Sequence, residues 1–229
     1  MREIVLDTET TGLDPAQGHR IVEIGCVELE NHMPTGRVFH KYLNPECSIS
    51  AEAVSVHGLT AEFLSDKPKF AEITDEFLQF IGSDSTLIIH NAAFDLKFLN
   101  FELNRVREGI NLTNAVIDTI LLARQKFPGS RVNLNELCRR FGIDLSARNL
   151  HGALLDSQLL SEVYLELIGG REPGLVFAVQ KEKIEVKVYQ ATPSNTIKRE
   201  ARSFDISSQE AEQHADFIKK IKNNLWNAA

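Results

Sequence analysis

The stretch EIVLDTETTG, residues 3–12, decides the fold class. Its first half is apolar and β-branched, which predicts a buried strand, and its second half is turn-prone, which predicts a loop. Asp7 and Glu9 stand two residues apart where the strand ends, so their side chains project from one face. Such a pair repels unless one acid is protonated or a cation lies between them, and a divalent ion with oxygen ligands is the common remedy. Taken alone, the pair more often marks a solvated strand end.

Outward from this strand, the hydrophobic pattern predicts a mixed sheet flanked by helices. Short connections indicate that two further strands, at residues 21–29 and 38–43, pair with the first in an antiparallel meander. After that, apolar strands alternate with helices. The strands are predicted at residues 86–90 and 115–120, and the helices at residues 70–81, 94–106, 133–141 and 152–168. The whole is an α/β fold with five strands.

Two more acids follow the ends of predicted elements. Asp95, in HNAAFD, lies in the first helical turn after the strand at 86–90, where the helix dipole alone could explain it. Asp156, in HGALLD, shares its helical face with an apolar stripe, so it is an inward acid that needs a partner or a metal ion. His151 precedes the same helix, where an imidazole could take a proton near neutral pH, although a lone loop histidine usually has no task. Together these residues match a phosphodiesterase with two metal ions.

Composition limits the class of protein. With 229 residues and 43% hydrophobic content, the chain is long enough for one globular domain with an extension. The segment from Lys181 onward holds nine basic and seven acidic residues, which leaves a net charge of −9 on the first 180 residues. An acidic body argues against bulk neutralisation of long nucleic acid, but not against a nuclease that meets a few terminal phosphates through bound metal ions.

Cysteine usage and the N-terminal sequence indicate the compartment. Cys26, Cys47 and Cys138 lie far apart without a CxxC pair, which fits neither a disulfide framework nor a zinc site. The first ten residues contain acids and cannot supply a secretion signal, and no apolar run approaches the ~20 residues that span a bilayer. We therefore expect a cytoplasmic protein without a membrane partner.

The C-terminal part is predicted to be a flexible tail that ends in a helix. The expected organisation is a catalytic domain at residues 1–172, a linker at 173–206, which holds at most a short strand, and a helix within 207–229. One face of this helix carries an apolar stripe formed by Phe217, Ile218, Ile221 and Leu225, with Trp226 beside it. An isolated stripe needs something to bury it, either a partner protein or the body of the same chain.

Three motifs in this order, DTETTG, HNAAFD and HGALLD, resemble the exonuclease motifs of the DEDDh family, which has a ribonuclease H-like fold. Within that family, the segments IVEIGCVEL, VHGL, DKPKFAE, RQKFPG and LSEVYLELIGG resemble the epsilon group of proofreading subunits of bacterial DNA polymerase III. The resemblance covers residues 1 to about 170. It implies a 3′-5′ exonuclease that releases nucleoside 5′-monophosphates from a DNA 3′ end.

The resemblance also implies roles for single residues. Asp7, Glu9 and Asp156 would bind one Mg²⁺ or Mn²⁺ ion, and Asp7 with Asp95 a second, the two ions being about 4 Å apart. His151 would deprotonate the attacking water. The terminal nucleotide would be contacted by Asp7, Glu9, Glu52, His57 and Asp156. Replacing Asp7 or Asp156 by alanine is expected to abolish hydrolysis and leave the fold intact, because repulsion is relieved.

Partners follow from the same resemblance. The C-terminal helix would bind the polymerase alpha subunit, and a theta-like subunit and the sliding clamp are further candidates. In the clamp-binding peptide, Leu175 and Phe177 could be the apolar anchors, but Arg171 stands where a glutamine is expected. Two rival functions stay open, an exoribonuclease of the same family and a non-catalytic nucleic-acid-binding scaffold. The tail argues against the first, and the complete set of acids argues against the second.

Overall fold

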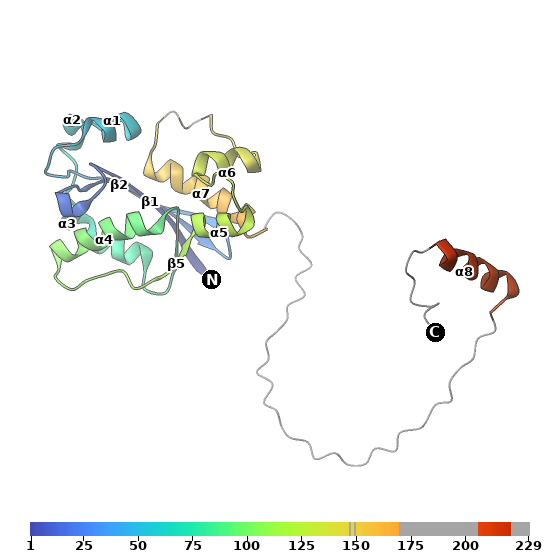
Figure 1. Cartoon of the computed structure of the whole chain (residues 1–229). Helices are drawn as coiled ribbons and strands as arrows, with labels where there is room; N and C mark the ends of the chain where they lie inside the picture. Colours follow the sequence, from blue (N-terminus) through green and yellow to red (C-terminus); the bar gives the residue numbers. More distant parts are fainter. Residues whose placement is uncertain (147, 149, 170–205, 221–229) are drawn as a thin grey trace, which may run out of the picture. The chain divides into compact units, whose positions relative to one another are not determined.

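The computed structural model describes residues 1–146, 148, 150–169 and 206–220. The chain divides into two units, Met1–Phe177 and Ala178–Ala229 (Figure 1). The first unit holds the sheet, and in the second the described element is helix α8 (Ser208–Lys220). Among the described residues, no helix is long and apolar enough to cross a membrane. The predicted linker strand and clamp peptide lie outside the described residues.

The first unit is built on a sheet of five strands in the order β3-β2-β1-β4-β5. β1 pairs antiparallel with β2, and β2 with β3, whereas β4 runs parallel to both β1 and β5. The strands are β1 (Arg2–Thr10), β2 (Ile21–Glu30), β3 (Met33–Tyr42), β4 (Thr86–Ile89) and β5 (Ala115–Asp118). The predicted mixed sheet, with its initial meander, is confirmed.

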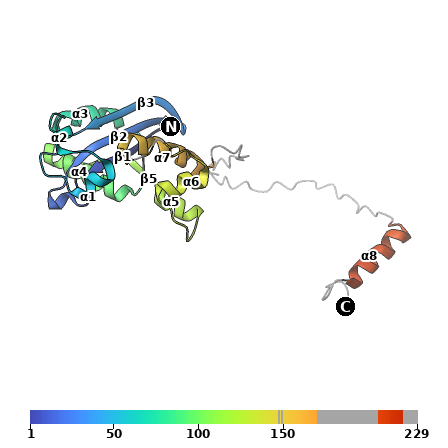
Figure 2. The same ribbon diagram turned by 90° about the horizontal axis from the view of Figure 1, so that it is seen from above.

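Helices cover both faces of the sheet (Figure 2). One core packs α3 (Phe70–Ile81) and α4 (Ala92–Val106) on the first face, and a second core packs α5 (Thr119–Lys126), α6 (Leu134–Phe141) and α7 (Ala153–Leu167) on the other. Four of these helices were predicted within two residues of their bounds. The sequence reading missed α5, the short helices α1 (Ala51–His57) and α2 (Ala61–Leu64), and a 3-10 turn at Pro15–Gln17.

Alternation along β1 assigns its acids to one side of the sheet. Ile4 and Leu6 lie in the core under α3 and α4, while Val5 lies in the core under α5, α6 and α7. Since side chains alternate along a strand, Asp7 and Glu9 share the side of Val5, which is the side of α7. The chemistry of the β1 end is therefore directed toward α7.

Gly25 of β2 lets the start of α7 lie directly on the sheet. A Cβ atom at Gly25 would stand 2.2 Å from backbone atoms of Ala153 and Leu154, closer than any real contact. The hydroxyl of Ser157 donates to the Gly25 carbonyl at 2.9 Å. This close approach fixes the first turns of α7, which carry Asp156, against the strand next to β1.

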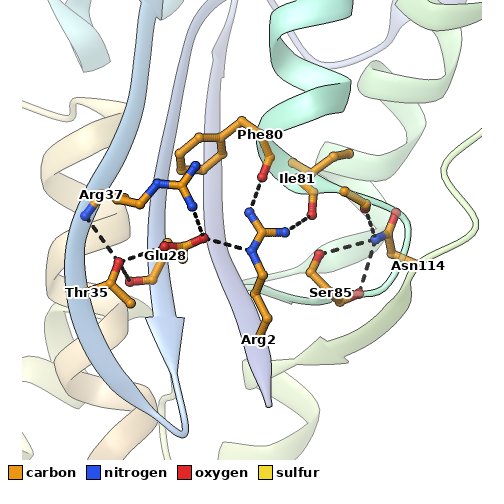
Figure 3. Close-up of polar contacts among 9 residues, drawn as sticks. Arg2, Glu28, Thr35, Arg37, Phe80, Ile81, Ser85 and Asn114 are labelled. Carbon is orange, nitrogen blue, oxygen red and sulfur yellow. Dashed lines mark hydrogen bonds and ion pairs between the residues drawn. The ribbon is translucent and has the colours of Figure 1, made fainter.

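Arg2 ties the end of α3 to the sheet (Figure 3). Its guanidinium donates to the Ile81 carbonyl at 2.6 Å and to that of Phe80, two carbonyls that the helix itself leaves without partners. Its Nε donates to Glu28 of β2 at 2.7 Å. The side-chain amide of Asn114 bonds the carbonyl of Gly82 at 2.8 Å, just before β4 begins. This network holds α3 and the chain leading to β4 at the amino end of the sheet.

Candidate active site

The ends of β1 and β4 and the start of α7 meet at a polar cleft of about 450 Å³. Its lining residues include Asp7, His90, Asn135, Arg148, His151 and Asp156. Ligand atoms of Glu9, His151 and Asp156 all lie within 4.8 Å of one another, which is close enough to share one metal ion. Acids that are up to 149 residues apart in the sequence thus come together, as the sequence analysis expected for a metal site.

Asp95 is held in place from β1. Its Oδ1 accepts the backbone N–H of Thr8 at 3.1 Å and the Thr8 hydroxyl at 2.7 Å, and the residue is buried in the first turn of α4. Asp118 caps the same helix by accepting from the backbone N–H of Ala92 at 3.1 Å. Because Asp118 accepts from the first turn of α4, Asp95 is not needed as its cap, and the charge of its buried carboxylate acts on Asp7 instead.

The acids raise one another's pKa values. Burial raises the pKa of Asp7 well above its usual range, and Asp95, Glu9 and Asp156 add to the effect by repulsion. Burial, with repulsion from Asp156 and Glu23, raises the pKa of Glu9 to about 8. Burial also raises the pKa of Asp95 to about 7, against the hydrogen bonds from Thr8. Buried carboxylates that resist ionisation need a compensating cation, and an all-oxygen set of this kind fits a hard divalent ion.

Asp156 differs from the other acids because it has a basic partner. The guanidinium of Arg148 donates from Nε and Nη2 to both oxygens of Asp156, each at 2.5 Å. Burial opposes the charged form of Asp156, but hydrogen bonds from His151 and Arg148 outweigh it and lower the pKa. We attribute the lowering to Arg148, because its guanidinium is an obligate donor and also donates to His151 Nδ1 at 2.9 Å, which leaves that nitrogen no proton to give Asp156.

His151 stands at the rim of the cleft. Its side chain is 46% exposed, and its backbone N–H donates to the carbonyl of Val56 in α1 at 3.1 Å. The neighbouring Leu150 side chain fills the space beside Gly58, at the end of α1. The loop before α7 is therefore anchored on α1, while the imidazole remains open to water and to a substrate.

A second cavity of about 270 Å³ adjoins the acids on the side of α1. Glu9, Glu52, His57 and Phe94 are among its lining residues. His57 is buried, and its Nδ1 accepts the backbone N–H of Leu59 at 3.0 Å, so a neutral ring carries its proton on Nε2. Among the described residues none forms a hydrogen bond with this Nε2. His57 thus lines this cavity with its ring, next to the candidate metal ligand Glu9, while Nε2 itself is buried.

Sequence reasoning missed two polar residues of the cleft. His90 bonds Thr119 through Nδ1 at 2.8 Å, and its buried Nε2 has no hydrogen bond within the described part of the chain. Arg148 lies three residues before His151, in a loop whose conformation no periodic pattern reveals. His90 could have been identified from the sequence, because it is the last residue of the strand predicted at 86–90 and the first residue of the HNAAFD motif.

Comparison of the sequence with known proteins gives consistent results. Residues 4–164 match the exonuclease family RNase_T. The chain is 50% identical to a DNA polymerase III subunit epsilon of Rickettsia felis over 227 residues, which cover 96% of this chain and 97% of the relative. It is 48% identical to the protein of the same name from Escherichia coli K12 over 188 residues, 79% of this chain and 76% of the relative.

Solved exonucleases have the same fold. Exonuclease X in complex with 5′ overhanging duplex DNA superposes with a TM-score of 0.58 at 25% identity, over 73% of this chain and 92% of that chain. The nuclease domain of 3′hExo, a DEDDh family member solved with rAMP, gives a TM-score of 0.63 at 21% identity over the same shares. These likenesses confirm the expected ribonuclease H-like arrangement of the first unit.

Proposed function

The chain belongs to the exonuclease family, and from this premise we propose that it is a 3′-5′ proofreading exonuclease subunit of DNA polymerase III. The observation that carries the proposal is the meeting of Glu9, His151 and Asp156 within 4.8 Å, beside Asp7 and Asp95 with their raised pKa values. A binding scaffold does not require buried acids that repel one another, whereas a phosphodiesterase uses such acids to hold metal ions.

Asp7, Glu9, Asp95 and Asp156 are the residues that would hold two divalent ions, Mg²⁺ or Mn²⁺. Bound ions of this kind activate an attacking water and stabilise the charge on the leaving 3′ oxygen. His151 takes the proton from the water, because its exposed ring stands beside Asp156 and a neutral imidazole nitrogen can accept a proton. The product is a nucleoside 5′-monophosphate.

The cavity beside α1 is the place for the terminal nucleotide. Phe94 offers an apolar surface there, and the His57 ring and the carboxylate of Glu52 offer polar groups. Nothing in this set reads a base sequence. A mispaired end is selected because it is cheaper to unpair and thread into the site, by a few kcal/mol. Proofreading therefore depends on a polymerase that delivers the end.

The polymerase alpha subunit is the proposed partner of the second unit. In α8 the side chain of Phe217 is 62% exposed, which leaves an apolar ring available for a partner protein. Ile218 of the predicted stripe is half-buried, whereas Ile221 and Leu225, with Trp226 beside them in the sequence, lie outside the described residues. A theta-like subunit and the sliding clamp are further proposed partners. The candidate clamp-binding peptide at residues 171–179 has Arg171 where a glutamine is expected.

Digestion of three 3′-labelled substrates tests the function. We expect Mg²⁺-dependent release of mononucleotides, faster from a mismatched DNA end than from a matched one and slower from RNA. Asp7→Asn should lose at least about a hundredfold in rate, because it removes a metal ligand. His151→Gln should lose activity and keep its affinity for metal ions. A preference for RNA ends would favour the exoribonuclease, and binding of DNA without hydrolysis would favour the scaffold.

A further inference from the structure

Arg148 is a buried cation in the middle of the proposed metal site. Its side chain is 6% exposed, and its fork covers both oxygens of Asp156, whose side chain is 5% exposed. The third nitrogen, Nη1, donates to Oδ1 of Asn135. Every nitrogen of the guanidinium is thus engaged, and two of them are committed to one carboxylate.

The same carboxylate is a proposed metal ligand. Two charge-assisted hydrogen bonds at 2.5 Å engage both of its oxygens, and an ion shared with Glu9 would use one of the same oxygens. A guanidinium and a divalent ion in adjacent positions also repel each other strongly in a site with little water. An ion at Asp156 would therefore meet a carboxylate that Arg148 already holds by both oxygens.

We propose that Arg148 is the internal counter-cation of the acid cluster and competes with the divalent ion for Asp156. The guanidinium balances the acids until an ion displaces it. This inference rests on the proposed function, because it requires that Asp156 bind an ion during the reaction.

Displacement also changes the state of His151. Nη2 of Arg148 is an obligate donor and engages the lone pair of His151 Nδ1 at 2.9 Å. Withdrawal of Arg148 from Asp156 would therefore free a proposed metal ligand and a ring nitrogen of the proposed base in one movement.

A rival role predicts the opposite sign. If Arg148 stays on Asp156 and only orients it for the ion, then removing the arginine disorders a ligand and weakens metal binding. If the two cations compete, removing the arginine strengthens binding. The direction of the change in metal affinity separates the two roles, whatever happens to activity.

The test is a titration of the full chain with Mn²⁺, followed by calorimetry at one pH. Arg148→Met should lower the Mn²⁺ dissociation constant about tenfold or more, because hydrogen bonds to a charged group usually contribute a free energy of that size. The matched control is Arg139→Met, because Arg139 lines the same cleft but pairs with the exposed Glu136, at 2.7 Å. Since it removes the same charge without touching Asp156, Arg139→Met should change the constant by less than about threefold.

A second variant guards against loss of folding. Arg148→Lys keeps the charge but cannot form the fork, so it should fold and tighten Mn²⁺ binding by an intermediate factor. In addition, Mn²⁺ should raise the melting temperature of Arg148→Met more than that of the wild type. Unchanged or weaker Mn²⁺ binding in both Arg148 variants would overturn the competition. If the wild type and every variant failed to bind Mn²⁺, the proposed function itself would fall instead.

Discussion

At the scale of single residues, the cleft keeps its acids in two different states. Glu9 and Asp95 have pKa values raised to about 8 and about 7, so a large share of each is protonated at neutral pH without an ion. Asp156 is ionised, because Arg148 pairs with it. The charge of the cluster is thus reduced by protons on one side and by a guanidinium on the other, and a divalent ion has to displace both.

This state predicts that the metal-free protein loses stability as the pH rises. The folded pKa of Glu9 lies above its ordinary value of 4.5, so its favourable contribution is complete below pH 4.5 and is lost as the pH passes through about 8. In EDTA the melting temperature should fall by several degrees between pH 6 and pH 9, given roughly 2–4 °C per kcal/mol for a domain of this size. Calorimetry at both pH values measures this fall in the melting temperature.

The matched control for that experiment is Glu9→Gln, which keeps the shape and cannot ionise. Its melting temperature in EDTA should depend less on pH than that of the wild type. Saturating Mg²⁺ should stabilise the wild type more at pH 9 than at pH 6, because binding the ion no longer requires removal of protons. An equal pH dependence in Glu9→Gln would show that Glu9 is not the group that titrates.

Asp7 and Asp156 should respond to substitution with opposite signs in stability. Asp7→Asn relieves repulsion among buried acids and should raise the melting temperature in EDTA. Asp156→Asn leaves the buried Arg148 without its charged partner and should cost about 3–5 kcal/mol. Both variants should be inactive. Thermal unfolding in EDTA distinguishes them, and a stabilised Asp156→Asn protein would contradict the importance of the ion pair.

The sequence alone predicted relief of repulsion at both positions, and the structure changes this expectation for Asp156. The motifs are sufficient to bring Asp7, Glu9, Asp95, His151 and Asp156 near one another, because each lies close to the end of a recognisable strand or the start of a recognisable helix. The partnership with Arg148 depends on the conformation of an irregular loop. Glu52 and His57 were identified by resemblance, since neither carries a distinctive spacing of its own.

At the scale of elements, the approach of α7 to β2 decides where Asp156 lies. Helices with a strong apolar period, such as α3, were predicted with correct bounds. The shorter α1 and α2 span too few residues for a period to be visible, and their signals are the capping residues Ser50 and Thr60. Helix α5 was missed in the sequence analysis because the apolar run at 115–120 continues past the end of the strand into the helix. Asp118 ends the strand, and its side chain caps α5.

Gly25→Ala should therefore disturb the active site from a distance. The added methyl group would stand 2.2 Å from the backbone of α7, and the helix can yield only by moving away from the sheet. We expect a loss of about 1–3 kcal/mol in stability. A shift of Asp156 and His151 by about 1 Å should lower kcat/KM about a hundredfold. Circular dichroism melting and digestion of a single-stranded oligonucleotide measure the two effects.

Gly152→Ala is the control for this change. It adds the same methyl group at the start of the same helix, but the nearest heavy atom, Glu23 Oε1, is 4.0 Å away, and the backbone there is extended. This variant should melt within about 2 °C of the wild type. If Gly25→Ala matched Gly152→Ala in both measurements, the contact between β2 and α7 would not position the site.

At the scale of the whole molecule, the chain joins the unit that holds the proposed active site to a second unit with its own helix. Both hydrophobic cores and every proposed site residue belong to the first unit. The described residues of α8 are mostly exposed, including the aromatic ring of Phe217. Amphipathic spacing was enough to predict this helix, but spacing does not identify what covers an apolar face. Such a question is decided by a binding measurement.

We predict that Phe217→Asp separates the two activities of the full chain. An acid in place of an exposed aromatic anchor should weaken binding to the polymerase alpha subunit at least about tenfold, because anchors of this kind carry much of an interface's energy. Hydrolysis of a free single-stranded 3′ end should be unchanged. The matched control is Leu121→Asp, which introduces the same charge at a 57% exposed apolar residue of α5, in the first unit. Gel filtration of the mixed subunits, with a titration for the affinity, measures the binding. Equal affinity for Phe217→Asp and the wild type would place the polymerase contact elsewhere on the chain.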